Sequence, residues 1–191
     1  MKSSLICADD FLLTKKISLG IIKLIEKNKI NSVSSMVIFK KNIKYGYLLK
    51  KKIKPTQIIG LHLVLTHFKP LSKFKQIKVF PGIFGLYLNI IFNKILKYEI
   101  ENEIKSQILE FKKIFGTLPK YIDGHHHVHQ IPIISNILIR VVNEIYQDKK
   151  PVVRNTSLNI SLILSNNISV VKTSILSVFG YFFKKKLKKN L

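Results

Sequence analysis

Short and long apolar segments alternate along this chain. Residues 3–8, 33–39 and 57–65 are short apolar or β-branched runs bounded by polar residues, which predicts strands. Residues 14–29 and 40–54 carry apolar side chains at helical spacing, and the second segment is strongly basic. The first part of the chain therefore predicts the order strand, helix, strand, helix, strand.

The second part continues this order after an interruption. Residues 66–95 are interrupted by Pro70, Pro81, Gly82 and Gly85 and predict a long loop with a short helical insert. Residues 98–115 and 132–147 predict helices, while residues 119–123 and 152–154 predict strands. Regular alternation of strands and helices is typical of a parallel α/β protein, in which sites lie at the carboxyl ends of strands.

The charge balance is extreme for a chain of this length. The 191 residues include 33 Lys and Arg against 10 Asp and Glu, a net charge of +23. Only Arg140 and Arg154 are arginine, whereas proteins that read nucleic-acid sequence rely on arginine for bidentate contacts. We therefore predict no specific nucleic-acid partner and attribute most of the charge to lysine-rich composition, leaving peripheral contact with an anionic membrane as an alternative.

Cysteine usage and the N-terminus bear on the compartment. Cys7 is the single cysteine, which excludes an internal disulfide and fits a reducing environment. Asp9 and Asp10 interrupt the first apolar run too early for a signal peptide, and no apolar window reaches the length of about 18 residues that a spanning helix needs. These features predict a cytoplasmic protein, with membrane-peripheral attachment left open.

Three polar insertions stand at the ends of predicted strands. Asp9 and Asp10 are adjacent carboxylates, which repel each other unless a cation or proton compensates them. With a metal bound, one carboxylate can ligate while the other acts as a general base. His62 lies inside the third predicted strand. Taken alone, the Asp pair also fits a loop or helix cap, and His62 also fits a hydrogen-bonded core residue.

The third insertion is a histidine cluster. Four of the six histidines lie within residues 125–129. If this segment is extended, His125, His127 and His129 share one face and His126 points to the other. Imidazole is the commonest nitrogen ligand of zinc and related metals, and Asp123 can orient a ligand histidine.

Together the three insertions suit one divalent ion held by an aspartate and two histidines. Such a site supports metal-assisted hydrolysis, in which a nearby carboxylate takes a proton from water and a histidine protonates the leaving group. A phosphoesterase is a weaker alternative, because Asp/His metal sites serve several chemistries.

The same residues carry a family resemblance. Residues 8–11 (Ala-Asp-Asp-Phe), residues 60–66 and residues 123–129 resemble the three signature blocks of the YdjC-like carbohydrate deacetylases, in family order. The resemblance covers about residues 3–155 and implies a distorted, incomplete (β/α) barrel with parallel strands. It also implies a metal-dependent hydrolase that removes acetyl groups from N-acetylated sugars of the chito-oligosaccharide or glycolipid type, acting on a C–N amide bond.

The resemblance implies residue roles as well. The metal would be one divalent ion, Mg²⁺ or Zn²⁺. The roles are metal ligation by Asp10, His62 and His125, catalysis by Asp9 as general base together with His129, and substrate contact or ligand orientation by Asp123, His127 and Arg154.

The sequence departs from the family pattern at two places. Leu12 stands where the family continues with Gly, and a late His-Pro block has no counterpart. We therefore expect a deacetylase domain over residues 1–155 and a divergent apolar, Lys-rich tail over residues 156–191, which is either the shortened end of that domain or a membrane-surface segment. The site would be completed by His129 or by a partner in a homodimer. The alternative function is a catalytically decayed member that binds anions or membrane surfaces.

Overall fold

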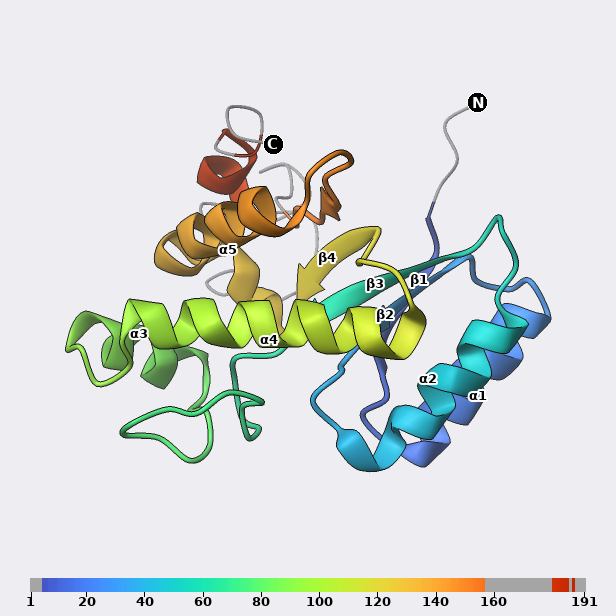
Figure 1. Ribbon diagram of the computed structural model, residues 1–191, viewed down its shortest axis with the longest axis horizontal. Coiled ribbons are helices and arrows are strands. Elements are labelled where there is room, and N and C mark those ends of the chain that lie inside the picture. Colours follow the sequence, from blue (N-terminus) through green and yellow to red (C-terminus); the bar gives the residue numbers. More distant parts are fainter. Residues whose placement is uncertain (1–4, 157–179, 186, 188–191) are drawn as a thin grey trace, which may run out of the picture.

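The computed structural model describes residues 5–156, 180–185 and 187 of the chain (Figure 1). Strands and helices alternate, as the apolar pattern predicts. In chain order the elements are β1 (Cys7–Phe11), α1 (Lys15–Glu26), β2 (Ser32–Ser35), η1 (Lys40–Asn42), α2 (Ile43–Lys52), β3 (Ile58–Leu63), α3 (Ile83–Ile91), α4 (Lys97–Phe115), β4 (Tyr121–Gly124), η2 (His125–Gln130), α5 (Pro132–Ile145) and β5 (Val152–Val153).

The five strands form one parallel sheet in the order β1-β2-β3-β4-β5. The predicted α/β class with parallel strands is therefore confirmed. Within the described residues the sheet is open, with β1 and β5 at its edges, as expected of an incomplete barrel. Because every strand runs the same way, all five carboxyl ends meet along one edge of the sheet.

Local signals set the helix ends. The Thr14 hydroxyl accepts a hydrogen bond from the Ile17 backbone N–H at 3.2 Å and caps α1. Gly116 ends α4 in the left-handed conformation, with φ of 81°, which costs a residue with a side chain more than it costs glycine. Pro132 stands at the first turn of α5, where its missing N–H is not needed.

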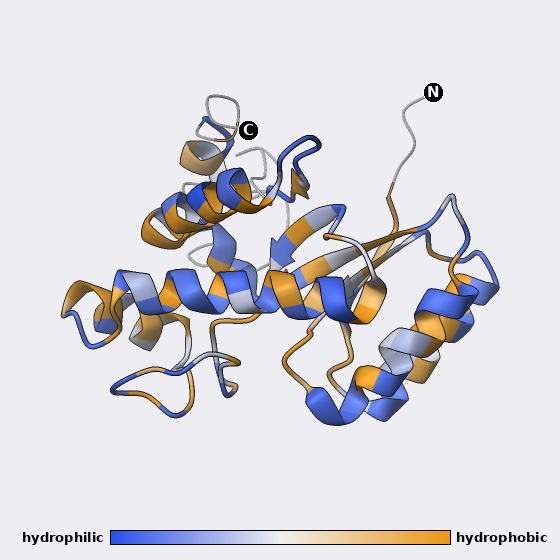
Figure 2. Ribbon diagram, viewed as in Figure 1, coloured by the Kyte–Doolittle hydropathy of each residue, from blue (hydrophilic) through white to orange (hydrophobic). Residues whose placement is uncertain are grey.

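Each long helix buries one apolar face. Ile21, Ile22 and Ile25 of α1 are buried, and the buried side chains of α4 include Ile100 and Ile104. In Figure 1, α1 and α2 lie side by side at one end, and α4 runs across the molecule beside β3. In Figure 2 orange and blue residues alternate along α4, as an amphipathic helix requires.

The first strand differs from its prediction over residues 3–8. It begins at Cys7 and contains Asp9 and Asp10, whereas Leu5 and Ile6 are exposed. The reason is pairing, because the first registered pair between β1 and β2 is Cys7 with Ser32 and β1 is an edge strand. The apolar run of residues 3–8 therefore indicated that a strand was near but did not give the residue at which β1 begins.

Three other elements are shorter than predicted, although each is of the predicted kind. The strand predicted over residues 33–39 spans Ser32–Ser35, and the basic helix predicted over residues 40–54 divides into η1 and α2. The strand predicted over residues 57–65 spans Ile58–Leu63.

The predicted loop over residues 66–95 is confirmed, and α3 is its helical insert. Two buried carboxylates of α4 hold this loop. Glu103 accepts hydrogen bonds from the backbone N–H groups of Leu71 and Ser72 at 3.0 and 2.7 Å. Glu99 accepts from the Lys75 N–H at 2.7 Å and the Leu96 N–H at 2.8 Å. Backbone N–H groups of the loop are therefore paired with carboxylate oxygens, where in a sheet they would be paired with a neighbouring strand.

Most of the predicted tail, residues 156–191, lies outside the described residues, although residues 180–185 are helical. Among the helices that the structure describes, none combines the length and the apolar character needed to cross a membrane.

Candidate metal and active site

Every strand delivers a polar side chain to the same edge of the sheet. The contributions, in chain order, are Asp9 and Asp10 from β1, Ser34 from β2, His62 from β3, Asp123 from β4 with His125 directly after it, and Arg154 directly after β5. This shared edge is where the parallel topology places a site. Six of the eight predicted site residues lie at this edge, and the other two, His127 and His129, follow in η2.

A bulge in β1 arranges the Asp pair. The register between β1 and β2 shifts between Ala8 and Phe11, and Asp10 has φ of 62°. Aspartate tolerates this left-handed conformation better than most residues. Bulges re-aim side chains next to active sites. Leu12, where the family has Gly, also has a positive φ of 75°, so it adopts the backbone that glycine would adopt freely.

The histidine cluster is not extended, and the prediction that His125, His127 and His129 share one face is wrong. The segment is the 3₁₀ helix η2, with a kink at which His126 and His127 have φ of 54° and 57°. Gly124 permits this fold-back, because a Cβ on it would lie 2.8 Å from Nδ1 of His129. The chain thus leaves β4 in a tight turn that sends successive imidazoles to different places.

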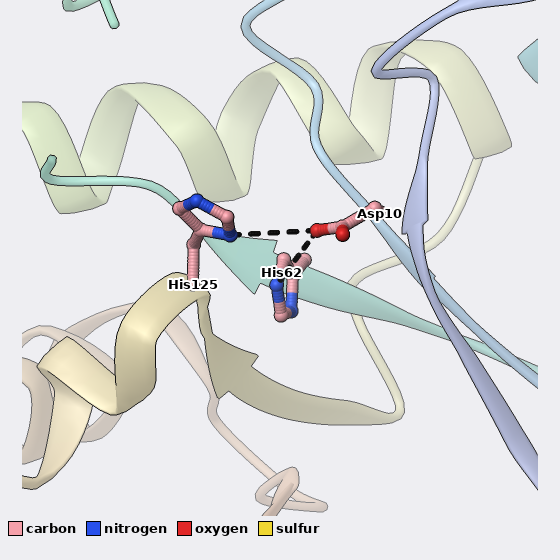
Figure 3. Close-up of side chains that lie close together, drawn as sticks. All are labelled: Asp10, His62 and His125. Atoms are coloured by element: carbon pink, nitrogen blue, oxygen red, sulfur yellow. Dashed lines mark ion pairs between the residues drawn. The ribbon is translucent and has the colours of Figure 1, made fainter. Parts of the chain in front are cut away.

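Asp10, His62 and His125 form a compact group (Figure 3). Asp10 Oδ1 lies 3.4 Å from His62 Nε2 and 3.4 Å from His125 Nδ1. The three ligand atoms lie within 4.8 Å of one another. Asp10 Oδ1 is buried and has no hydrogen-bond partner among the described residues. A buried carboxylate oxygen that faces two imidazole nitrogens without a hydrogen bond fits a divalent cation.

His62 connects this group to a second carboxylate. Its Nδ1 lies 2.7 Å from Asp123 Oδ1, and Ser34 donates its hydroxyl hydrogen to the same Asp123 oxygen. With Nδ1–H donated to Asp123, Nε2 is oriented toward Asp10, which is the arrangement that fixes a metal-binding histidine. This geometry is the one that the predicted role of Asp123, orienting a ligand histidine, requires.

The charges of this network follow from the same contacts. Burial acts to lower the pKa of His62, but Asp10 and Asp123 outweigh burial and raise the pKa to about 9. His62, in turn, holds the pKa of Asp10 below its ordinary value. For His125, burial and the neighbouring His126 and His62 lower the pKa to about 4. At neutral pH the metal-free group therefore contains an ionised Asp10, a protonated His62 and a neutral His125.

Arg154 holds the other carboxylate of the Asp pair. Its Nη1 lies 3.0 Å from Asp9 Oδ2 and 3.2 Å from Asp123 Oδ2. Asp9, His62 and Asp123 form a second group whose ligand atoms are mutually within 4.8 Å, and Arg154 already supplies this group with a cation. Asp9 thus lies beside the first group and is held by a fixed positive charge.

His127 and His129 lie outside both groups. His127 is half-buried, and burial together with Arg154 lowers its pKa. His129 is completely buried, and its Nε2–H donates to the Arg154 carbonyl oxygen at 2.8 Å. The predicted catalytic role of His129 and the predicted substrate role of His127 remain predictions.

Sequence reasoning missed Ser34, Thr66 and Phe68. The Thr66 hydroxyl lies 3.0 Å from His126 Nδ1, and the Phe68 ring lies against His125 with ring centroids 5.9 Å apart. The signal for Ser34 was the unusual strand Ser32–Ser35, whose four residues are all buried although three are serine. Thr66 ends the signature block of residues 60–66, whereas Phe68 carried no comparable signal.

The fold and site together define a class of protein. Five parallel strands meet at an edge that carries an Asp/His group suited to one divalent ion, with a second carboxylate beside it. This arrangement is that of a parallel α/β protein with a candidate metal site at the carboxyl edge of its sheet.

A sequence model of the YdjC-like protein family matches residues 5–189, so the chain belongs to this family and the predicted relationship is confirmed. The match includes residues 156–189, while the predicted division at residue 155 remains a prediction.

A solved structure supports the same relationship. The crystal structure of a candidate cellobiose-phosphate cleavage protein from Enterococcus faecalis V583 is similar to this chain, with 27% sequence identity and a TM-score of 0.64. The similarity covers 82% of this chain and 60% of that protein. The chain therefore spans less than two thirds of the length of this relative.

Proposed function

We propose that the protein is a divalent-metal-dependent deacetylase that hydrolyses the acetamide group of N-acetylated sugars. The observation that carries this proposal is the buried Asp10 Oδ1, which faces two histidine nitrogens at 3.4 Å and has no hydrogen-bond partner in the part of the chain that the structure describes. The YdjC-like family of carbohydrate deacetylases, to which the chain belongs, supports the substrate class. Both chito-oligosaccharides and sugar-bearing lipids carry the required acetamide group.

Asp10, His62 and His125 would hold the ion. When bound, the ion polarises the amide carbonyl and lowers the pKa of a water molecule. Two imidazole nitrogens with one carboxylate oxygen suit Zn²⁺ and related ions better than Mg²⁺, which prefers oxygen ligands.

The remaining residues act on protons and on positions. Asp9 accepts a proton from water as the water oxygen bonds to the acetyl carbon, and it returns this proton to the amine as the C–N bond breaks. Arg154 holds Asp9 in place at 3.0 Å. We propose that His129 contributes by holding the Arg154 backbone, since the His129 side chain is fully buried. His127, half-buried beside Arg154, is the proposed sugar contact.

The first test is metal content together with acetate release. We expect the purified protein to bind about one divalent ion per chain, measured by elemental analysis, and to release acetate from N-acetylglucosamine oligomers. A chelator should abolish the release, and Zn²⁺ should restore it. Acetate release that survives complete removal of the ion would contradict the proposal.

A second prediction concerns protons. Because the pKa of His62 is about 9 and that of His125 about 4, Zn²⁺ binding at pH 6.5 should displace about one proton, from His62. Calorimetric titration in buffers of different ionisation enthalpy measures this number. As the pH rises toward 9, the number of protons released on Zn²⁺ binding should fall, because His62 is already partly deprotonated in the metal-free protein. Binding at pH 6.5 without proton release would show that His62 is not the ligand.

Three further predictions accompany this function. A cytoplasmic location, a homodimer and the absence of a specific nucleic-acid partner remain predictions. We also propose that Cys7 is a structural thiol and not a nucleophile, because its sulfur lies 3.0 Å from the Tyr121 hydroxyl and burial raises its pKa to about 11, so it stays protonated.

A further inference from the structure

The loop that contains α3 exposes an unusual number of large apolar side chains. Phe84 is 72% exposed and Phe92 is 67% exposed. Between Val79 and Tyr98 the exposed large apolar residues are Val79, Ile83, Phe84, Tyr87, Ile91, Phe92 and Tyr98. Single exposed apolar residues are ordinary, but a concentration of seven within 20 residues marks a contact surface.

The exposed residues of α3 share one side of the helix. At 100° per residue, Ile83, Phe84, Tyr87 and Ile91 fall within a sector of about 100°. The buried residues Leu86 and Ile90 occupy a different sector and attach the helix to the core. The helix α3 therefore has two apolar sides, only one of which the described fold covers. In Figure 2 this part of the molecule is largely orange.

The surroundings of this surface are basic. Residues 66–98 contain six lysines and no aspartate or glutamate. All six are exposed: Lys69, Lys73, Lys75, Lys78, Lys94 and Lys97. The next three carboxylates along the chain are Glu99, Glu101 and Glu103. Glu99 and Glu103 are 2% and 0% exposed because they accept backbone hydrogen bonds from the loop, and Glu101 forms ion pairs with Lys105 and Arg140. The nearest carboxylates in sequence are thus either turned inward or paired with cations outside residues 66–98.

We propose that this apolar-basic surface, residues 66–98, docks the protein on an anionic lipid bilayer. The exposed aromatic and aliphatic side chains of α3 suit the acyl-chain region of such a bilayer. The lysines around them suit its negatively charged headgroups. A second copy of the chain fits less well, because it would bring another six lysines against these. The inference goes beyond the proposed function and needs neither metal nor substrate.

The surface is connected to the metal group. The Phe68 ring lies against the ligand His125, and the His67 ring contacts His126 with centroids 5.1 Å apart. The backbone N–H of His67 also donates a hydrogen bond to the carbonyl oxygen of Pro81 at 3.2 Å, and Pro81 lies just before α3. Docking through α3 would therefore hold the site close to the bilayer, where acetylated sugars attached to lipids are presented.

Vesicle binding tests this inference on the full chain. We expect sedimentation with vesicles of phosphatidylcholine and phosphatidylglycerol, weak sedimentation with pure phosphatidylcholine, and loss of binding in high salt. The double variant Phe84→Ser/Phe92→Ser should bind at least about tenfold more weakly. Replacing Lys78 and Lys94 by glutamine should weaken binding about fivefold per lysine.

Matched variants separate this surface from general stickiness and charge. Leu109→Ser removes an exposed apolar residue of α4, and Lys15→Gln/Lys16→Gln removes two exposed charges of α1. Both should bind vesicles as the unaltered chain does. Equal losses in these controls would overturn the proposal. So would negligible binding of the unaltered chain at low salt, or a dimer that Phe84→Ser/Phe92→Ser dissociates while vesicle binding is unchanged.

Discussion

Asp10→Asn is expected to remove the divalent ion and to lower acetate release roughly a thousandfold. The change deletes one charge while keeping the size of the side chain. Asparagine also accepts the positive φ of 62° that the bulge requires, so the fold should persist. The loss therefore falls on the oxygen that faces His62 and His125. Elemental analysis and the acetate assay measure the two effects.

Asp148→Asn is the matched control, because it makes the same substitution at an exposed carboxylate outside the site. It should leave metal content and acetate release unchanged. If Asp10→Asn kept both its ion and its activity, Asp10 would not be a ligand.

Asp9→Asn is expected to separate catalysis from metal binding. Asp9 stands outside the group of Asp10, His62 and His125, so the variant should retain its ion. Asparagine cannot accept the proton from water, and acetate release should fall by about 10²- to 10⁴-fold, the usual contribution of a general base. The fall should appear in kcat, with KM nearly unchanged.

The Arg154→Lys variant refines this test. Lysine keeps the positive charge beside Asp9, but its shorter side chain and freely rotating ammonium do not hold Asp9 and Asp123 in the fixed geometry that the planar guanidinium gives. We expect a smaller loss of activity than in Asp9→Asn, with the ion retained. Loss of the ion in Asp9→Asn would instead identify Asp9 as a ligand, and full activity would remove it from the mechanism.

The fold could be predicted to the level of its elements. Helical spacing in residues 98–115 and the short apolar run of β3 reflect burial in the core, which local sequence encodes. Boundaries were less accurate, since β1 begins where its partner Ser32 begins and not where its apolar run does. Pairing between distant segments decided this limit.

The site shows the same division. The residue types at strand ends indicated a metal site, and the described structure brings Asp10, His62 and His125 together. Periodicity failed for the histidine cluster, because an alternating pattern assumes an extended backbone, whereas Gly124 and two left-handed histidines turn the chain into η2. Sequence spacing carries no record of such positive φ angles in residues other than glycine.

By itself, the sequence determined the parallel α/β class, the family and the set of chemical groups, since periodicity and local motifs are properties of short segments. Only the tertiary structure decided how those groups divide their roles. It pairs His62 with Asp123, places Arg154 against Asp9 and buries His129. It also turns Glu99 and Glu103 inward and leaves the lysines around α3 exposed. The physical reason is that burial and charge pairing depend on contacts between residues far apart in the chain.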